Sequence, residues 1–117
     1  MPNESAPIEI TLTSRFRKNL KKLSKRYRLI RSDLEPLISQ LQSGKLPGDQ
    51  IVGSGLTLFK VRLKNSNIQK GKSAGYRVVY YTKTKEKITL VTIYSKSDRA
   101  DVSVSEVEAI LTEDKIG

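Results

Sequence analysis

Apolar and polar residues alternate strictly along residues 57–64 (TLFKVRLK), the pattern of a strand with one buried face. Because successive side chains of a strand point to opposite faces, one face receives three apolar residues and the other three cations. The apolar residues are Phe59, Val61 and Leu63, and the cations are Lys60, Arg62 and Lys64. One face of this strand is therefore predicted to be core, and the other to be a row of positive charge.

Two further apolar segments, residues 75–82 (GYRVVYYT) and 87–96 (KITLVTIYSK), are joined by a short turn at 83–86 and predict an antiparallel meander. Each is apolar on both faces, so we expect two central strands covered by helix on at least one side. In the first segment, Val78 and Tyr80 are expected on one face and Val79 and Tyr81 on the other. In the second, Ile88 and Leu90 are expected on one face and Val91 and Ile93 on the other. Arg77 is the one charge inside these strands and must lie at a cleft or be paired, because an unpaired buried charge is costly.

Ahead of the meander, residues 8–12 alternate and predict a short first strand. Apolar residues then recur at helical spacing to about Arg28, with Thr13 as a suitable N-cap. The residues of this apolar stripe are Phe16, Leu20, Leu23 and Tyr27. They predict a helix that packs on the sheet.

A second helix is predicted to begin at Ser32 or Asp33, because Ser32 and Glu35 match a capping box. Gly44 supplies a left-handed stop. The apolar stripe of this second helix consists of Leu34, Leu37, Ile38 and Leu41. A turn near residues 30–32 joins the two helices into an antiparallel hairpin that covers the sheet.

Near the C-terminus, Ser103 and Glu106 form another capping box, which predicts a terminal helix. Its apolar residues are few, so we expect it to dock weakly; they are Val104, Val107, Ile110 and Leu111. The chain is predicted to be one α+β domain over residues 1–117, with residues 1–7 as a loose terminus. Its sheet is based on the antiparallel meander and packs against the N-terminal helical hairpin, with a short C-terminal helix added.

The charge of the chain points to a polyanionic partner. With 22 basic and 12 acidic residues its net charge is +10, and residues 15–31 hold nine basic residues and no acidic one. Those nine are Arg15, Arg17, Lys18, Lys21, Lys22, Lys25, Arg26, Arg28 and Arg31. Like charges one turn apart on a helix repel each other, so this run favours a surface that binds an anion, most often nucleic acid.

Cysteine and histidine are both absent from the sequence. Their absence excludes disulfides, thiol nucleophiles and imidazole acids or bases, so any catalysis must come from Lys, Arg, Tyr, Ser or carboxylates. The acidic residues are scattered, and no metal or other cofactor is expected. The start of the chain has no basic and apolar leader pattern, and no stretch is long enough to span a membrane, so we expect a cytoplasmic protein.

Four motifs in order carry a resemblance to a known family: PGDQIVGSG, FKVRL, QKGKSAGYRVVYY and TLVTIYSKSDRADVS. Over residues 47–105 in detail, and elsewhere in outline, the chain resembles the RelE/ParE superfamily of toxins from toxin-antitoxin pairs. It is most similar to the HigB-like branch. The resemblance implies a small RelE-like fold and an endoribonuclease that cuts messenger RNA, usually on the ribosome. It also implies a cognate antitoxin that silences the protein.

The resemblance also indicates which residues act. The family's basic strand residues fall on Lys60 and Arg62, and its arginine after the GY pair falls on Arg77. A further arginine and a tyrosine of the RelE pattern are replaced here by Ser97 and Ser103. The residues that remain near that end of the last strand are Tyr94, Lys96 and Arg99.

Metal-independent cleavage of RNA needs a positioned 2′-OH, stabilisation of charge on the phosphate and help with proton transfer. We expect Arg62 and Arg77 to bind the scissile phosphate, since guanidinium and phosphate match in shape and charge. Lys60 is expected to transfer a proton or stabilise charge, with Lys96 as the alternative. The residues expected to hold the RNA are Lys18, Lys22, Lys64, Lys70, Lys72, Tyr94 and Arg99.

Two other functions fit the same sequence. A protein similar to ParE would have the same fold but would inhibit DNA gyrase, a role that needs no row of cations on the sheet. A protein that binds RNA or the ribosome without cutting RNA would explain the missing histidine and the replacements at Ser97 and Ser103.

Overall fold

The computed structural model describes residues 7–68 and 74–115. In chain order the elements are β1 (Glu9–Leu12), α1 (Ser14–Arg26), α2 (Ile30–Gln42), β2 (Asp49–Ile51), β3 (Leu58–Leu63), β4 (Tyr76–Thr84), β5 (Lys87–Ser95) and α3 (Val104–Glu113). The terminus predicted to be loose falls outside these ranges, apart from Pro7. Within them, no helix has the length and apolar character needed to cross a membrane.

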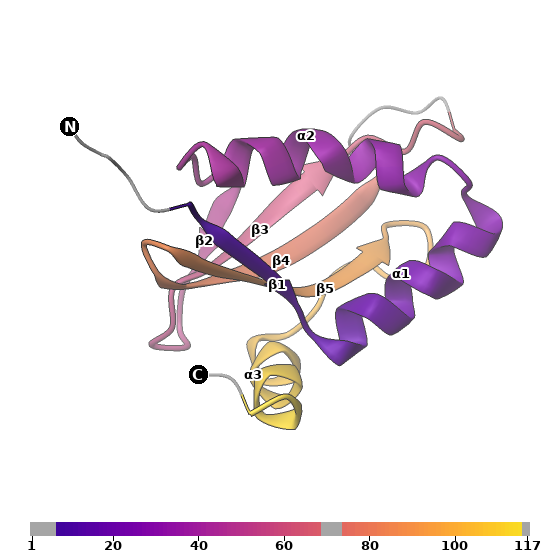
Figure 1. The fold of residues 1–117 in the computed structure, drawn as a ribbon. Helices are drawn as coiled ribbons and strands as arrows, with labels where there is room; N and C mark the ends of the chain where they lie inside the picture. Colours follow the sequence, from indigo (N-terminus) through magenta and orange to yellow (C-terminus); the bar gives the residue numbers. More distant parts are fainter. Residues whose placement is uncertain (1–6, 69–73, 116–117) are drawn as a thin grey trace.

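The five strands form one mixed sheet in the order β1-β5-β4-β3-β2. β1 pairs in parallel with β5, and the other neighbours are antiparallel, so β3, β4 and β5 make the predicted meander. α1 and α2 lie on one face of the sheet, and α3 lies on the opposite face (Figure 1). The prediction of an α+β fold is confirmed, and β4 and β5 are central strands as expected.

The first core lies between the sheet and the two N-terminal helices. Its buried helical residues are Phe16, Leu23, Ile30, Leu34, Leu37 and Leu41. Thr13 caps α1 as predicted, because its hydroxyl accepts a hydrogen bond from the N–H of Phe16 at 2.9 Å. The same hydroxyl donates to the carbonyl of Val91 at 2.6 Å, which ties the start of the helix to β5. α1 ends at Arg26, two residues before its predicted end.

α3 builds a second core on the other face of the sheet. Val107, Ile110 and Leu111 are at most 2% exposed, so the prediction that this helix docks weakly is wrong. They pack with Leu58, Val79, Tyr81 and Val91 of the sheet. The predicted cap is confirmed, since the Ser103 hydroxyl accepts from the N–H of Glu106 at 3.1 Å. A short helix therefore suffices to bury half of this face of the sheet.

A β-bulge in β5 changes which side chains share a face. The register between β4 and β5 shifts between Val79 and Tyr80, which leaves Val91 as an extra residue on β5. Ile93 therefore packs in the first core, whereas Val91 packs in the second. The expectation that these two side chains share a face is wrong, because one extra residue reverses the alternation beyond it.

α2 begins at Ile30, and the capping box predicted from Ser32 and Glu35 is wrong. Among the described residues, no side chain at the N-cap position accepts a hydrogen bond from the first turn of the helix, and Ile30 is fully buried, so packing in the core fixes its start. Asp33, the other predicted start of this helix, binds the loop after β3: its carboxylate accepts from the backbone N–H of Ser66 at 2.8 Å. This contact joins α2 to the end of the strand that carries the row of cations.

The connector between α2 and β3 contains β2 (Asp49–Ile51), a short strand that was not predicted from the sequence. Gly44 ends α2 with a φ of +91°, as predicted, and Gly48 has a φ of +96°. A side chain on Gly48 would collide with the backbone carbonyl of Lys60, so glycine lets the chain approach β3. β2 then pairs with β3 so that Asp49 lies opposite Lys60.

Candidate functional site

The sheet face that packs against α3 is only partly covered by that helix. The part of this face beside the second core carries polar side chains. Arg62 lies opposite Arg77, and Arg77 lies opposite Tyr94, across β3, β4 and β5. Residues paired in this way project to the same face of a sheet. Lys60 precedes Arg62 by two residues on β3 and therefore shares that face. The register thus gathers three cations and a phenol on three adjacent strands.

β2, β3, β4 and the segment after β5 line a cavity of about 680 Å³. Its lining residues are Asp49, Gln50, Ile51, Val52, Lys60, Arg62, Arg77, Lys96, Ala100 and Asp101. All four residues predicted to be catalytic, Lys60, Arg62, Arg77 and Lys96, are among them. Four cations around one concave surface create a strong positive potential, which attracts and orients a polyanion.

Arg77 is the least exposed of the four cations, with 6% of its surface accessible. Its guanidinium donates a hydrogen bond to the carbonyl of Tyr76 at 3.2 Å. The preceding residue, Gly75, lies so close to the backbone of Leu63 that a side chain there would collide with it. The prediction that Arg77 lies at a cleft is confirmed, and its low exposure suits a guanidinium that exchanges little hydration for a bound phosphate.

Asp101 brings a carboxylate into this cationic cavity. Its Oδ1 accepts hydrogen bonds from Lys60 Nζ at 2.8 Å, from the N–H of Val102 at 2.8 Å and from the hydroxyl of Tyr94 at 3.4 Å. The bond from Lys60 is the main reason that the pKa of Asp101 lies below its usual range. Burial and the nearby carboxylate raise the pKa of Tyr94 to about 12. At neutral pH, Asp101 is therefore ionised and Tyr94 is protonated.

The segment that holds Asp101 is itself fixed by Arg99. The Arg99 guanidinium donates to both carboxylate oxygens of Glu106, at 2.8 and 2.9 Å, and its Nε donates to the backbone carbonyl of Asp101 at 2.9 Å. The hydrogen bond from Arg99 lowers the pKa of Glu106. The guanidinium also lies 5.5 Å from the centre of the Tyr94 ring. Arg99 thus links α3 to the edge of the cavity and holds Asp101 beside Lys60.

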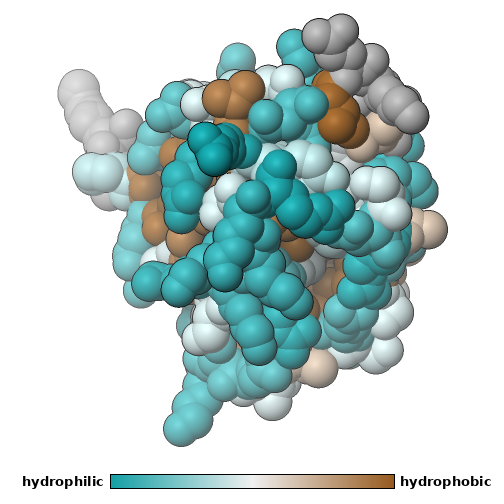
Figure 2. Space-filling model, turned by 90° about the vertical axis from the view of Figure 1, so that its right-hand side faces the viewer, coloured by the Kyte–Doolittle hydropathy of each residue, from teal (hydrophilic) through white to brown (hydrophobic). Residues whose placement is uncertain are grey.

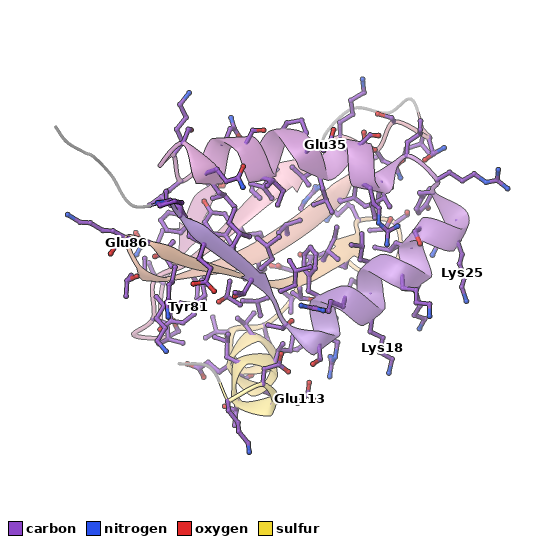
Figure 3. All side chains as sticks on the ribbon, viewed as in Figure 1. Lys18, Lys25, Glu35, Tyr81, Glu86 and Glu113 are labelled. Atoms are coloured by element: carbon purple, nitrogen blue, oxygen red, sulfur yellow. The ribbon has the colours of Figure 1, made fainter. Side chains whose placement is uncertain are left out.

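The residues predicted to hold RNA are distributed over several surfaces. Tyr94 reaches the cavity through Asp101, whereas Arg99 and Lys22 line a second cavity beside α1. Lys64 lines a third, between α2 and β3, and Lys18 is exposed on α1, where it projects to the same side as Lys25 (Figure 3). The remaining two, Lys70 and Lys72, lie outside the described residues.

The acidic and amide residues of the site were not predicted from the sequence. Asp49 and Gln50 belong to β2, whose three residues are too few to show a strand period. Asp101 follows β5 by six residues and is separated from Lys60 by 41 positions, so neither residue predicts the other. The available signal was the motif TIYSKSDRADVS, which contains Asp101 as well as three residues already selected from it, Tyr94, Lys96 and Arg99.

The chemistry of the cavity suits an anion better than a metal cation. In the part of the chain that the structure describes, no three acidic side chains gather at one point. The two carboxylates at the cavity, Asp49 and Asp101, lie among four cations, and Asp101 is already paired with Lys60. A phosphodiester would meet arginine, lysine and tyrosine donors there.

Comparison with known proteins gives one family match. The family model described as the RelE toxin of the RelE/RelB toxin-antitoxin system matches residues 15–115. This range includes every residue that lines the cavity. No curated protein matches the chain with significant similarity.

Proposed function

The chain belongs to the RelE toxin family, and from this premise we propose that it is an endoribonuclease that cuts messenger RNA on the ribosome and so inhibits translation. The observation that carries the proposal is the convergence of Lys60, Arg62, Arg77 and Lys96 on one cavity. Arg62 and Arg77 lie opposite one another on adjacent strands, which supports joint contact with one phosphate. Assignment to the HigB-like branch remains a prediction.

In the proposed reaction, Arg62 and Arg77 bind the non-bridging oxygens of the scissile phosphate. Charge on these oxygens grows as the 2′-oxygen attacks phosphorus, and fixed guanidinium donors stabilise that growing charge. Lys60 and Lys96 add positive charge from the two sides of the cavity. Arg62 and Arg77 are held by their strands, and the two lysines donate hydrogen bonds to Asp101 at 2.8 Å and to the carbonyl of Ala100 at 3.3 Å. Donors fixed in this way need little reorganisation when RNA binds.

Lys60 and Lys96 were the candidates from the sequence for proton transfer. We assign this step instead to Tyr94 and Asp101, because the Lys60 ammonium is already paired with Asp101. As the bond from the 2′-oxygen to phosphorus forms, the 2′ proton passes to the Asp101 carboxylate. As the bond from phosphorus to the 5′-oxygen breaks, the protonated Tyr94 gives its proton to the leaving oxygen. The products are a 2′,3′-cyclic phosphate and a free 5′-hydroxyl. No metal is required in this scheme, and Lys60 is the neighbour that keeps Asp101 ionised.

Membership of a toxin-antitoxin family implies an antitoxin partner. We propose that an acidic or amphipathic segment of that partner covers the cationic cavity, the outer face of α3, or both, by charge complementarity and added apolar burial. Binding there would separate RNA from Arg62 and Arg77. If the product of the adjacent reading frame neither bound the protein nor relieved its toxicity, this part of the proposal would be wrong.

The test of function is cleavage by the purified protein of a messenger RNA that is bound to ribosomes, with the 5′ ends mapped by primer extension. We expect defined cuts, 2′,3′-cyclic phosphate ends, and no cut where a 2′-deoxy nucleotide replaces the reacting one. A gyrase supercoiling assay is run in parallel. Inhibition of gyrase without RNA cleavage would support the alternative similar to ParE, and ribosome binding without either activity would support a non-catalytic role.

A further inference from the structure

A second cavity, of about 590 Å³, adjoins the proposed catalytic site. Its lining residues are Asn19, Lys22, Leu23, Lys25, Arg26, Thr92, Ile93, Tyr94, Ser95, Asp98 and Arg99. The chain after β5 contributes to both cavities: Asp98 and Arg99 line this one, and Lys96, Ala100 and Asp101 line the first. The ring of Tyr94 lies at the boundary, because it lines the second cavity while its hydroxyl bonds to Asp101 of the first.

The topology of the sheet explains why this cavity exists. β1 pairs with β5 only as far as Leu90, so the edge of β5 beyond that point meets α1 instead of a strand. Asn19 of α1 covers part of this edge, donating its side-chain amide to the hydroxyl of Thr92 at 3.1 Å and to the carbonyl of Ile93 at 3.3 Å. A helix cannot follow a strand edge as closely as another strand does, and the space left between them is the cavity.

The lining has the composition of a site for a nucleotide. Leu23 and the ring of Tyr94, each 6% exposed, contribute apolar surface to this lining, with Ile93 fully buried behind them. Its rim carries four cations against one carboxylate. Arg26 is paired with Asp98 at 2.8 Å and Arg99 with Glu106, so the charge that can meet a phosphate comes mainly from Lys22 and Lys25. Cavities of roughly 300–1,000 Å³ with an apolar wall and a few fixed polar groups are typical of small-ligand sites.

We propose that this cavity binds one nucleotide of the RNA flanking the cleavage site, an inference that rests on the proposed ribonuclease function. Its phosphate lies on Lys22 and Lys25, and its base lies against the apolar wall beside Tyr94. The carbonyl oxygen of Asn19, whose amide nitrogen is already engaged, is the acceptor available to a base edge. Figure 2 shows that the face of the molecule on the side of α1 is predominantly hydrophilic, which suits the passage of an RNA backbone towards this cavity.

The charge and shape favour RNA over an acidic peptide. A strand held in the first cavity must continue beyond it, and the second cavity lies across the single segment 96–101. A nucleotide uses both parts of the lining, because it carries one compact anion and one flat apolar ring. An acidic peptide would use the cations but would offer no flat group to the wall formed by Tyr94.

The experiment measures binding of uncleavable 2′-O-methyl oligoribonucleotides by fluorescence anisotropy, with the chain lengthened one nucleotide at a time in each direction. We expect the affinity of the parent protein to rise about tenfold when one particular flanking nucleotide is added, and this gain to disappear if that nucleotide is abasic. In the variant Lys22→Gln/Lys25→Gln this gain in affinity should be lost. The slope of the logarithm of the binding constant against the logarithm of salt concentration should become shallower by roughly 0.7 for each phosphate contact removed. Affinity for the shortest RNA should change far less.

The matched control is Lys83→Gln/Lys85→Gln, which removes the same charge from exposed residues at the far end of β4 and should keep the gain. Thermal unfolding of both variants checks that each is folded. If the parent binds RNA but the Lys22 and Lys25 variant keeps the whole gain, this inference is wrong while the proposed function stands. If the parent binds no RNA of any length, the proposed function fails first. Binding of a glutamate decapeptide that depends on Lys22 and Lys25, without the gain for RNA, would assign the cavity to a protein partner and overturn the inference.

Discussion

The two halves of the sheet face that packs against α3 differ in how they are covered. In one half, Leu58, Val79 and Val91 are fully buried under α3. In the other, Lys60, Arg62 and Arg77 lie on the same strands and point to the same side, but they line an open cavity. The strand that carries Leu58 carries Lys60 two residues later, so the boundary between core and site falls within one strand.

The position of a short helix defines the site. α3 is ten residues long and presents its buried side chains to only part of the sheet. The segment that leads into it, from Lys96 to Val102, forms one wall of the cavity and carries Asp101 to Lys60. Stability and function are therefore placed side by side, and substitutions in the two halves should have separable effects.

The largest expected effect is on the covered half. Ile110→Ala removes a side chain that is 1% exposed, so we expect unfolding to become easier by about 2–5 kcal/mol, from lost burial and the cavity left behind. Urea denaturation measures it. Ala109→Ser, at an exposed position on the same helix, should stay within about 0.5 kcal/mol of the parent. A small loss for Ile110→Ala would show that α3 is not an integral part of the fold.

The open half should respond in activity instead. Arg77→Lys keeps a positive charge but loses the paired donors of the guanidinium, so we expect RNA cleavage to fall on the order of a hundredfold. Single-turnover cleavage and urea denaturation are measured on the same preparation. Arg31→Lys, the same exchange at an exposed position of α2, serves as the control. Full activity in Arg77→Lys would remove Arg77 from the proposed phosphate contacts, and an unfolded variant would assign it a structural role.

Tyr94→Phe removes the proposed proton donor and leaves the buried ring in place. We expect cleavage of an ordinary RNA to slow by about a hundredfold, the lower range for loss of a general acid. An RNA with a 5′-thio leaving group, which needs no protonation, should be cut by Tyr94→Phe and by the parent at similar rates. Equal slowing on both substrates would show that Tyr94 positions the RNA and does not supply the proton.

The smallest effect concerns Asp101 and the pH dependence of stability. The pKa of Asp101 is lower in the folded protein than in the unfolded chain, so its ion pair stabilises the fold above the unfolded pKa of about 3.9 and loses that effect as pH falls through the folded value. At pH 7, Asp101→Asn should cost at most about 1 kcal/mol, because the pair with Lys60 is partly exposed. We expect the free energies of unfolding of the parent and of Asp101→Asn, measured from pH 7 down to pH 2, to become equal at the acidic end, where Asp101 is protonated. A difference in the free energy of unfolding that stays constant with pH would show that the charge of Asp101 does not stabilise the fold.

Much of the fold could be predicted from local pattern. Alternation in residues 57–64 set the strand and its two faces, and helical spacing with the Thr13 and Ser103 caps identified α1 and α3. These features are local, since strand period and capping involve residues only a few positions apart. The four cations of the site were also selected from the sequence: Lys60 and Arg62 by alternation on β3, Arg77 as the one charge inside the two central strands, and Lys96 by resemblance.

The bulge at Val91, the start of α2 at Ile30 and the short strand β2 could not be predicted in this way. Each depends on a partner distant in the chain: β4 for the bulge, the first core for Ile30, and β3 for β2. Local preference is weak there, and packing or strand pairing decides.

The sequence by itself determined which residues are cationic, which faces of the strands are apolar and which family the motifs resemble. The tertiary structure alone decided that α3 buries half of one sheet face and leaves the other half as a cavity. It also brought Asp101 to 2.8 Å from Lys60, 41 residues away, with Tyr94 on the same carboxylate. The physical reason is that a cation gains its chemical role from the charges and donors around it, and these come from segments that meet only when the apolar faces pack.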